Sequence, residues 1–242
     1  MSGHSKWSTI KRKKGALDAK RGKIFTKLIK EITVAARSGG GDVNSNPRLR
    51  LAVDNAKSQN MPSDNITRAI KKATGEMEGV QFLELNYEGY APAGVAVYVE
   101  AVTDNKNRTV AEVRHIFNKY GGSMGESGSV AWMFNHKGVI TLAEQEKSED
   151  DILELVMETG AEDVVLEDGY FTVSSEIDAF EPTRKAIVDS GLEVENASLQ
   201  WIAENEIDVS GEEAEKVIRL IDMLEDCDDV QNVYSNANFV DM

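Results

Sequence analysis

Residues 95–122 read VAVYVEAVTDNKNRTVAEVRHIFNKYGG, and this stretch indicates a domain of mixed α and β structure. Valine occupies every second position from Val95 to Val99, a spacing that is typical of a strand with one buried face. Residues 109–112 (TVAE) have the pattern of a capping box, so a helix is expected from there to about residue 120, where two glycines end it. The stretch therefore predicts a strand followed by a helix.

The sequence that follows this stretch predicts further strands. Val130–Phe134 and Val139–Leu142 are apolar runs separated by Asn135-His136-Lys137-Gly138, a pattern that predicts a hairpin. Near the C-terminus, a helix beginning at Ser210 and a strand near Val230–Tyr234 are expected. Residues 80–142 and 205–242 together then supply the βαββαβ order of a split βαβ plait, or ferredoxin-like fold.

The segment between these parts predicts a second domain of the same kind. A helix is expected from Ser148 to about Thr159, a tight hairpin at Asp168-Gly169, a helix over about 179–190 and a strand near Ser198–Ala203. We therefore expect an α+β fold in which a domain of residues 143–204 is inserted into the domain formed by 80–142 and 205–242. A plain sequential arrangement of the domains is the alternative.

Residues 1–76 predict a third domain, a compact bundle of three helices behind a basic tail of residues 1–16. Apolar residues recur at helical spacing over 17–37, and a serine and three glycines then end the helix. A second helix is expected from Asn46-Pro47 to about Gln59, and a third from Ser63, acting as N-cap, to Gly75. The change in sequence character near Gly75–Gly79 marks the domain boundary.

The charge of the chain divides at the same point. Residues 1–76 contain 17 Lys and Arg against 6 Asp and Glu, a net charge of +11, whereas residues 77–242 contain 10 against 36, a net charge of −26. A concentrated positive charge attracts polyanions and releases their counterions. The sequence therefore predicts a nucleic-acid-binding head on an acidic α/β body. The acidity of the body also has a simpler explanation, because acidic surfaces keep proteins soluble. Since the two parts have opposite charge, the body could also fold back on the basic head when no ligand is bound.

Two sets of residues are predicted to contact the nucleic acid or its assembly. Lysines and arginines would hold phosphates, and His4 and Trp7 would stack on bases. In the first set are His4, Lys6, Trp7, Lys11, Arg12, Lys13, Lys14, Lys20, Arg21, Lys23, Lys27 and Arg68. The second set lies in two loops and comprises Asn105, Lys106, Asn107, Arg108 and Met124.

Each of these loops has an alternative interpretation. Residues 103–109 also fit a polar turn in which Thr109 caps the following helix, without a role in binding. Residues 121–128 are rich in glycine but lack the spacing of a phosphate-binding motif and precede a strand rather than a helix. We interpret them as a flexible loop that contacts a macromolecular partner.

The sequence offers little for catalysis. The three histidines, His4, His115 and His136, lie in separate segments, and Cys227 stands among carboxylates that raise the pKa of its thiol. No cysteines and histidines have the spacing of a zinc site. We predict a protein with no catalytic residue, cofactor, metal or small-molecule substrate, and a monomer is favoured. The single cysteine and the lack of an apolar span or apolar N-terminal segment predict a cytoplasmic protein away from membranes.

The N-terminal run MSGHSKWSTIK at residues 1–11, followed by Lys13-Lys14 and by DAKRGK at residues 18–23, resembles the signature of the YebC/PmpR family. Relatives of that family include a mitochondrial translational activator of cytochrome oxidase. Further similarity extends through both halves of the chain, at Asn60-Met61-Pro62, Asn65-Ile66, Tyr87-Glu88-Gly89-Tyr90, Thr103-Asp104-Asn105, Asn107-Arg108-Thr109 and Gly121-Gly122.

The resemblance implies a helical N-terminal domain, two α/β domains and a role in gene expression without catalysis. Members are commonly described as DNA-binding transcriptional regulators, and some as ribosome-associated translation factors that assist synthesis through proline runs. We expect a DNA-binding transcriptional regulator, with the ribosome-associated translation factor as the alternative. The lysine-rich tail itself suits phosphate contacts on RNA. A protein-interaction module that uses the acidic body is a lesser alternative.

Overall fold

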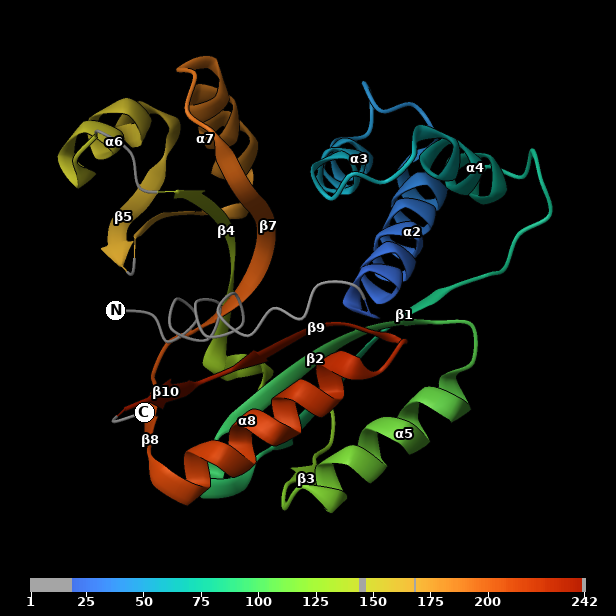
Figure 1. Ribbon diagram of the computed structural model, residues 1–242, viewed down its shortest axis with the longest axis vertical. Helices are drawn as coiled ribbons and strands as arrows, with labels where there is room; N and C mark the ends of the chain where they lie inside the picture. Colours follow the sequence, from blue (N-terminus) through green and yellow to red (C-terminus); the bar gives the residue numbers. More distant parts are fainter. Residues whose placement is uncertain (1–18, 144–146, 168, 241–242) are drawn as a thin grey trace. The chain divides into compact units, whose positions relative to one another are not determined.

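The computed structural model describes residues 19–143, 147–167 and 169–240 (Figure 1). The chain forms two compact units. One, the larger unit, contains the described residues up to Trp132 and those from Ile207 onward. The other, the inserted unit, consists of Met133–Glu206. Within the described residues there are seven α-helices, two four-stranded sheets and a two-stranded sheet, an α+β fold as expected.

The N-terminal part of the larger unit is a three-helix domain. Its helices are α2 (Ala19–Gly39), α3 (Pro47–Ser58) and α4 (Ser63–Ala73). The core between them consists mainly of small or β-branched side chains, which let the helices approach closely: Ile32, Ala35, Ala36, Leu49, Ala52, Val53, Ala56, Met61, Ile66, Ala69 and Ala73. The predicted three-helix bundle is therefore present.

Asn46 joins the first two helices of this domain. Its side-chain oxygen accepts a hydrogen bond from the backbone N–H of Leu49 at 3.1 Å, so it caps α3, which begins where it was expected. Its amide group also donates to the carbonyl oxygens of Ala35 and Gly40, both at 2.8 Å. The expected cap of α4 is wrong, because Ser63 is already helical and Pro62 takes the N-cap position.

The first α/β domain completes the larger unit. Its sheet has the order β3-β1-β2-β9, with every neighbouring pair antiparallel. Helices α5 and α8 lie side by side against it (Figure 1). The elements are β1 (Leu83–Tyr90), β2 (Ala96–Thr103), α5 (Lys106–Lys119), β3 (Ser123–Met124), α8 (Gly211–Asp226) and β9 (Val230–Ser235). Short β8 (Ile207–Val209) and β10 (Ala237–Phe239) pair in parallel beside it.

This domain differs from the predicted plait because its chain order begins with two strands before the helix. Strand β1 was not foreseen, since it contains polar and glycine residues at buried positions. Glu88 is 5% exposed. Gly89 lies so close to its neighbours that an added Cβ would stand 2.6 Å from the carbonyl oxygen of Ser123 and 2.8 Å from the Phe117 ring. Neither residue is typical of a strand interior.

The inserted unit is a split βαβ plait. Its chain order is βαββαβ and its sheet order is β5-β6-β4-β7, with antiparallel pairing between all neighbours. Helices α6 and α7 pack against each other and against the sheet. The elements are β4 (Phe134–Ala143), α6 (Glu149–Val156), β5 (Ala161–Glu167), β6 (Tyr170–Ser175), α7 (Ile177–Asp189) and β7 (Val194–Ala203). Strands β5 and β6 pair antiparallel as the predicted hairpin requires, ending at the pair Glu167 and Tyr170, while Asp168 lies outside the described residues.

The hairpin predicted within residues 130–142 is wrong. Residues 134–143 form one long strand, β4, which belongs to the inserted sheet rather than to the first one. Its apparent turn residues have partners across the sheet. His136 stacks on Trp201 with ring centroids 4.6 Å apart, and Gly138 allows the Phe180 ring to approach, since an added Cβ would lie 2.6 Å from it. The change between units therefore falls at Trp132–Met133 rather than at residue 142.

Candidate nucleic-acid interface

Most of the predicted tail contacts cannot be placed on the fold. His4, Lys6, Trp7 and residues 11–14 lie outside the described residues, and Lys20 and Arg21 belong to α2 without described side chains. The structure does place the other predicted residues, in three settings: along α2, on α4 and in two loops of the first α/β domain.

Lys23, Lys27 and Lys30 form a stripe along α2, which we call the α2 stripe. All three reach the segment at the C-terminal end of α8. Lys23 donates to the carbonyl oxygen of Asp226 at 2.9 Å, and Lys27 to that of Glu225 at 2.9 Å. The last carbonyl groups of a helix have no partner within it and carry the negative end of the helix dipole, so cations stabilise them. Lys23 and Lys27 were predicted to bind nucleic acid, but their ammonium groups make these internal contacts.

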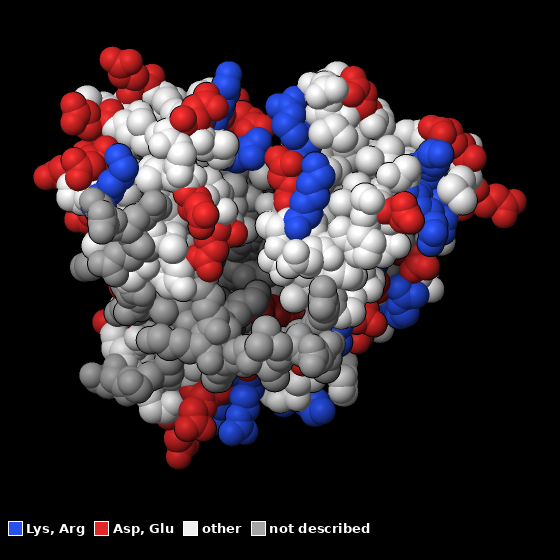
Figure 2. All heavy atoms as spheres, turned by 45° about the horizontal axis from the view of Figure 1, so that its top comes forward, with Lys and Arg blue, Asp and Glu red and all other residues white. Residues whose placement is uncertain are grey.

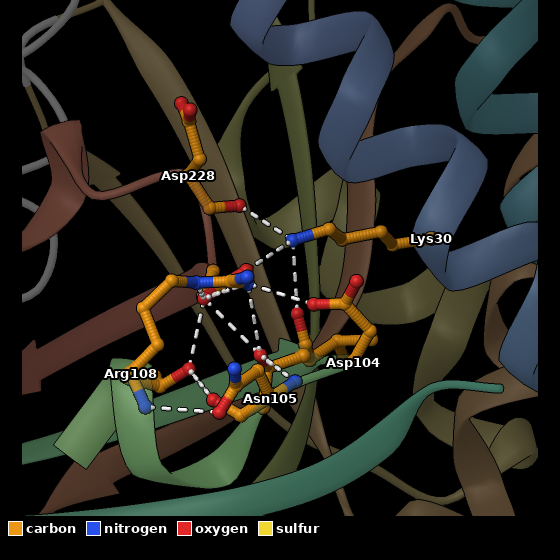
Figure 3. A network of polar contacts seen from close by, with 9 residues as sticks. Lys30, Asp104, Asn105, Arg108 and Asp228 are labelled. Carbon is orange, nitrogen blue, oxygen red and sulfur yellow. Dashed lines mark hydrogen bonds and ion pairs between the residues drawn. The ribbon is translucent and has the colours of Figure 1, made fainter. Parts of the chain in front are cut away.

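Lys30 lies deepest in the stripe, with a side chain that is 9% exposed. Its ammonium group donates to the carbonyl oxygens of Val102 (3.0 Å) and Asp228 (2.8 Å) and to Oδ1 of Asp229 (2.8 Å). Figure 3 shows this lysine pointing from α2 to the segment after α8. Three acceptors thus compensate the cost of removing the ammonium group from water.

Asp229 is the centre of this network. Besides Lys30, its carboxylate accepts hydrogen bonds from the hydroxyls of Thr103 (3.1 Å) and Thr109 (2.8 Å) and from Arg108 (Nη2, 2.8 Å). Burial alone would raise the pKa of Asp229, but the hydrogen bonds from Lys30, Arg108 and Thr109 lower it to about 2. Asp229 therefore ties α2, β2 and α5 together. Sequence reasoning missed it, because one carboxylate in an acidic run gave no signal.

The predicted loop of residues 103–109 is largely the start of α5. Asn105 is the N-cap, and its side chain accepts a hydrogen bond from the N–H of Arg108 at 3.1 Å. The predicted capping box at Thr109 is wrong, because Thr109 is buried one turn into the helix. Arg108 is paired with Asp104 (2.8 Å) as well as Asp229. Of the predicted contacts here, exposed Lys106 and Asn107 face outward, while Asn105 and Arg108 support the fold.

Helix α4 presents an exposed basic face. Arg68, Lys71 and Lys72 are exposed and recur at helical spacing, opposite buried Ile66 and Ala69. We call these three basic residues the α4 face. Only Arg68 was predicted as a contact. Lys71 and Lys72 were missed, although their spacing from Arg68 was a usable signal.

The surface charge is distributed unevenly. Residues 133–206 contain 4 Lys and Arg against 19 Asp and Glu, a net charge of −15. In Figure 2 acidic side chains predominate on the visible part of the inserted unit, whereas the visible part of α2–α4 also carries many basic ones. A polyanion is therefore repelled by the inserted unit and attracted by the helical domain.

The second predicted loop, residues 121–128, and the residues that follow it are held by a buried carboxylate, and we call residues 121–132 the Glu88 loop. The carboxylate of Glu88 accepts hydrogen bonds from the backbone N–H groups of Gly128 (2.7 Å), Val130 (2.7 Å) and Ala131 (2.8 Å). The carbonyl oxygen of Glu88 accepts another from Gly125 at 2.8 Å. Burial favours the protonated acid, but the three amides outweigh it and lower the pKa of Glu88. These bonds fix a loop that was expected to be flexible.

Aromatic side chains complete the same loop. The carbonyl oxygen of Ser129 accepts hydrogen bonds from the Tyr90 hydroxyl (3.1 Å) and from Nε1 of Trp132 (3.2 Å). Met124, a predicted contact, is half-buried in β3, where it pairs with Gly89.

The described residues contain no group of three or more His, Cys, Asp or Glu side chains arranged to hold a metal ion. Cys227 is buried, and this burial, together with Glu112, raises the pKa of its thiol to about 11. No helix in the described part of the chain is long and apolar enough to cross a membrane.

Comparisons with known proteins cover nearly the whole chain. A probable transcriptional regulatory protein of Desulforapulum autotrophicum is 57% identical over 241 residues, which covers 100% of this chain and 98% of the relative. Another, of Chlorobaculum tepidum, is 54% identical over 239 residues, covering 98% and 95%. The crystal structure of a conserved hypothetical protein from Aquifex aeolicus matches with a TM-score of 0.86 at 46% identity, covering 93% of each chain.

Two family descriptions match consecutive parts of the sequence. Residues 5–76 match "TACO1/YebC protein N-terminal domain", and residues 82–237 match "TACO1/YebC second and third domain". Together these matches span the helical domain and both α/β domains. The chain belongs to the TACO1/YebC family.

Proposed function

We propose that this protein is a nucleic-acid-binding regulator of gene expression that catalyses no reaction. The α4 face supports this most directly, since it turns three exposed cations outward from a domain whose residues carry a net charge of +11. Cations arranged along one helix face neutralise successive phosphates and release counterions. The relatives are named as probable transcriptional regulatory proteins, which agrees with a nucleic-acid target.

The contacts of the helical domain favour binding to phosphates over reading of base edges. Arg48 and Arg50 are the arginines of α3 with the chemistry to recognise guanine. Arg48 instead pairs with Glu31 (2.8 Å) and Glu84 (2.5 Å). Arg50 donates to the carbonyl oxygens of residues 43 and 44 at 3.2 and 2.6 Å. The two arginines of α3 are therefore engaged within the protein, whereas Arg68 of the α4 face is exposed.

Two targets follow from this arrangement. Duplex DNA, with a role in transcription, agrees with the names of the relatives. The ribosome, with a role in translation, agrees with a helical domain whose α3 arginines are engaged internally and whose exposed α4 face is mostly lysine, because folded RNA is recognised largely by shape and backbone. Both targets place the protein in the cytoplasm.

Binding to intact ribosomes and to duplex DNA fragments, measured side by side at physiological salt, distinguishes these targets. One variant neutralises Lys11, Arg12, Lys13 and Lys14, and a second replaces Arg68, Lys71 and Lys72 by Gln. A matched control replaces three exposed cations of the acidic body, Lys185, Lys216 and Arg219. Saturable ribosome binding that survives competitor DNA and weakens in both variants supports a translation factor. Sequence-dependent duplex binding with weak ribosome association supports a transcriptional regulator.

The same experiment tests the alternative in which the acidic body binds a protein partner. Under that alternative, both basic variants should bind their target as well as the natural sequence does, because their substitutions leave the inserted unit and its charge of −15 unchanged. If neither variant loses binding to any nucleic acid, the proposal is wrong and the search moves to protein partners.

A further inference from the structure

We propose that Trp132, held in place by the Glu88 loop, is a stacking platform for an unpaired nucleobase of RNA. This inference rests on the proposed function and adds a ligand class and a contact residue to it. Trp132 is 68% exposed, more than any of the other large hydrophobic side chains in the described residues. Exposing a side chain of this size to water is unfavourable, and exposed tryptophans are enriched at recognition sites.

The orientation of the indole ring favours stacking over hydrogen bonding. Its only donor, Nε1–H, is directed at the carbonyl oxygen of Ser129 at 3.2 Å. With the donor engaged inside the loop, the exposed part of the side chain is its ring. A ring face binds any base by stacking, and such contacts are tolerant of sequence. This agrees with the internal engagement of Arg48 and Arg50, the arginines of α3.

The loop is built to hold this ring rigidly. Glu88 fixes the backbone at Gly128, Val130 and Ala131, so the residue directly before Trp132 is anchored. Gly125 packs so tightly that an added Cβ would stand 2.5 Å from the Ser129 hydroxyl oxygen. A surface loop with this many fixed groups loses little further entropy when it binds a partner. Glu88 is therefore a positioning residue for Trp132.

The charges around the loop favour a single displaced base over a duplex. Lys119, exposed on the last turn of α5, lies just before the loop in the chain and offers one phosphate contact. Glu126, exposed within the loop, repels a continuous phosphate backbone. One exposed cation before the loop and one exposed carboxylate within it suit a base extruded from a bulge or a single strand, as is usual in RNA recognition.

The test uses the full chain with Trp132 as its only tryptophan, obtained by Trp7→Phe and Trp201→Phe. A fluorescein-labelled single-stranded oligoribonucleotide is titrated while its anisotropy reports binding. In parallel, an unlabelled copy is titrated while the indole emission reports stacking. We expect the emission to fall in proportion to the fraction bound. Duplex RNA of the same sequence should quench it less.

Three substitutions in the otherwise natural sequence, two at Trp132 and one at Glu88, add a functional measurement. Trp132→Leu keeps an apolar side chain but removes the aromatic ring, and should weaken oligonucleotide binding about tenfold. Trp132→Phe should restore part of that loss. The midpoint of thermal unfolding should stay unchanged in both Trp132 variants, because the side chain is exposed. Glu88→Gln, which disrupts the bonds to the loop amides, should increase the rotational freedom of the indole and weaken binding less than Trp132→Leu does.

The outcomes separate this inference from the proposed function. If the oligonucleotide binds without quenching and Trp132→Leu binds as well as the natural sequence, the inference is overturned while nucleic-acid binding stands. If Trp132→Leu loses ribosome binding although RNA never quenches the indole, the ring contacts a protein and the inference is again overturned. If neither RNA nor DNA binds the natural sequence, the proposed function itself fails.

Discussion

The α2 stripe and the α4 face belong to one small helical domain and contain the same kinds of side chain, yet they meet opposite surroundings. Lys23, Lys27 and Lys30 reach carbonyl groups and a carboxylate of the first α/β domain. Arg68, Lys71 and Lys72 are exposed on the outer face of α4. The comparison teaches that a positive charge in the sequence does not tell whether the cation is available to a ligand. Its availability is decided by the partners that the fold brings to it.

The largest effect that this comparison predicts is on stability, through Asp229. Asp229→Asn removes the negative charge that faces buried Lys30, and an uncompensated buried charge is strongly destabilising. We expect the free energy of unfolding to fall by about 3 kcal/mol, as measured by denaturant titration. Asp228→Asn is the matched control, since Asp228 contributes only its carbonyl oxygen to Lys30. Equal effects of the two substitutions would contradict the assigned role of Asp229.

The second effect is on binding, through the α4 face. Replacing Arg68, Lys71 and Lys72 by Gln should weaken nucleic-acid binding by about tenfold or more, because each lost phosphate contact removes nearly one unit from the slope of log affinity against log salt. The free energy of unfolding should change by less than about 0.5 kcal/mol, since all three side chains are exposed. An unchanged affinity with a large loss of stability would reverse the roles that we assign to the two faces.

The third effect is the pH dependence of the internal contact. A folded-state pKa of about 2 for Asp229 lies below the ordinary value of about 3.9 for an unfolded chain. The ionised carboxylate therefore stabilises the folded protein above about pH 4, and this contribution is lost as the pH falls through 4 towards 2. The stability difference between the natural sequence and Asp229→Asn should narrow by about 1 kcal/mol between pH 6 and pH 3. A constant difference over this range would contradict the lowered pKa.

The smallest effect concerns the outer part of the α2 stripe. The side chain of Lys23 is 44% exposed, and solvent weakens its interaction with the end of α8. Lys23→Gln together with Lys27→Gln should lower the free energy of unfolding by less than about 1 kcal/mol. The slope of affinity against salt should stay close to that of the natural sequence. A larger effect on binding than on stability would show that these lysines serve the ligand.

The sequence predicted the features that arise from local patterns. Helical spacing located α2, α3 and α4, the Asn46-Pro47 pair marked the start of α3, and the order of elements indicated the inserted plait apart from its first strand, β4. The prediction failed where a residue serves a distant partner. Strand β1 was not predicted because Glu88 and Gly89 are unusual in a strand interior, and their roles there depend on contacts with residues 117–131. Gly138 looked like part of a turn until Phe180 was placed against it.

The candidate interface was less predictable than the fold for the same reason. Lys30 and Asp229 are separated by 199 positions, and nothing local distinguishes them from other charged residues. Charge composition correctly separated a basic region from an acidic one, but it could not divide the basic residues between α2 and α4. Arg108 was likewise predicted to contact a ligand, but its guanidinium group pairs with Asp229.

The most direct test of the central claim is the salt dependence of nucleic-acid binding for three full-length proteins: the natural sequence, the α4-face triple variant, and the Lys23→Gln, Lys27→Gln variant. Log affinity is plotted against log salt concentration for ribosomes and for duplex DNA. We predict that the triple variant has a slope about two to three units shallower, whereas the double variant keeps the natural slope. A shallower slope in the double variant with an unchanged slope in the triple variant would contradict the account.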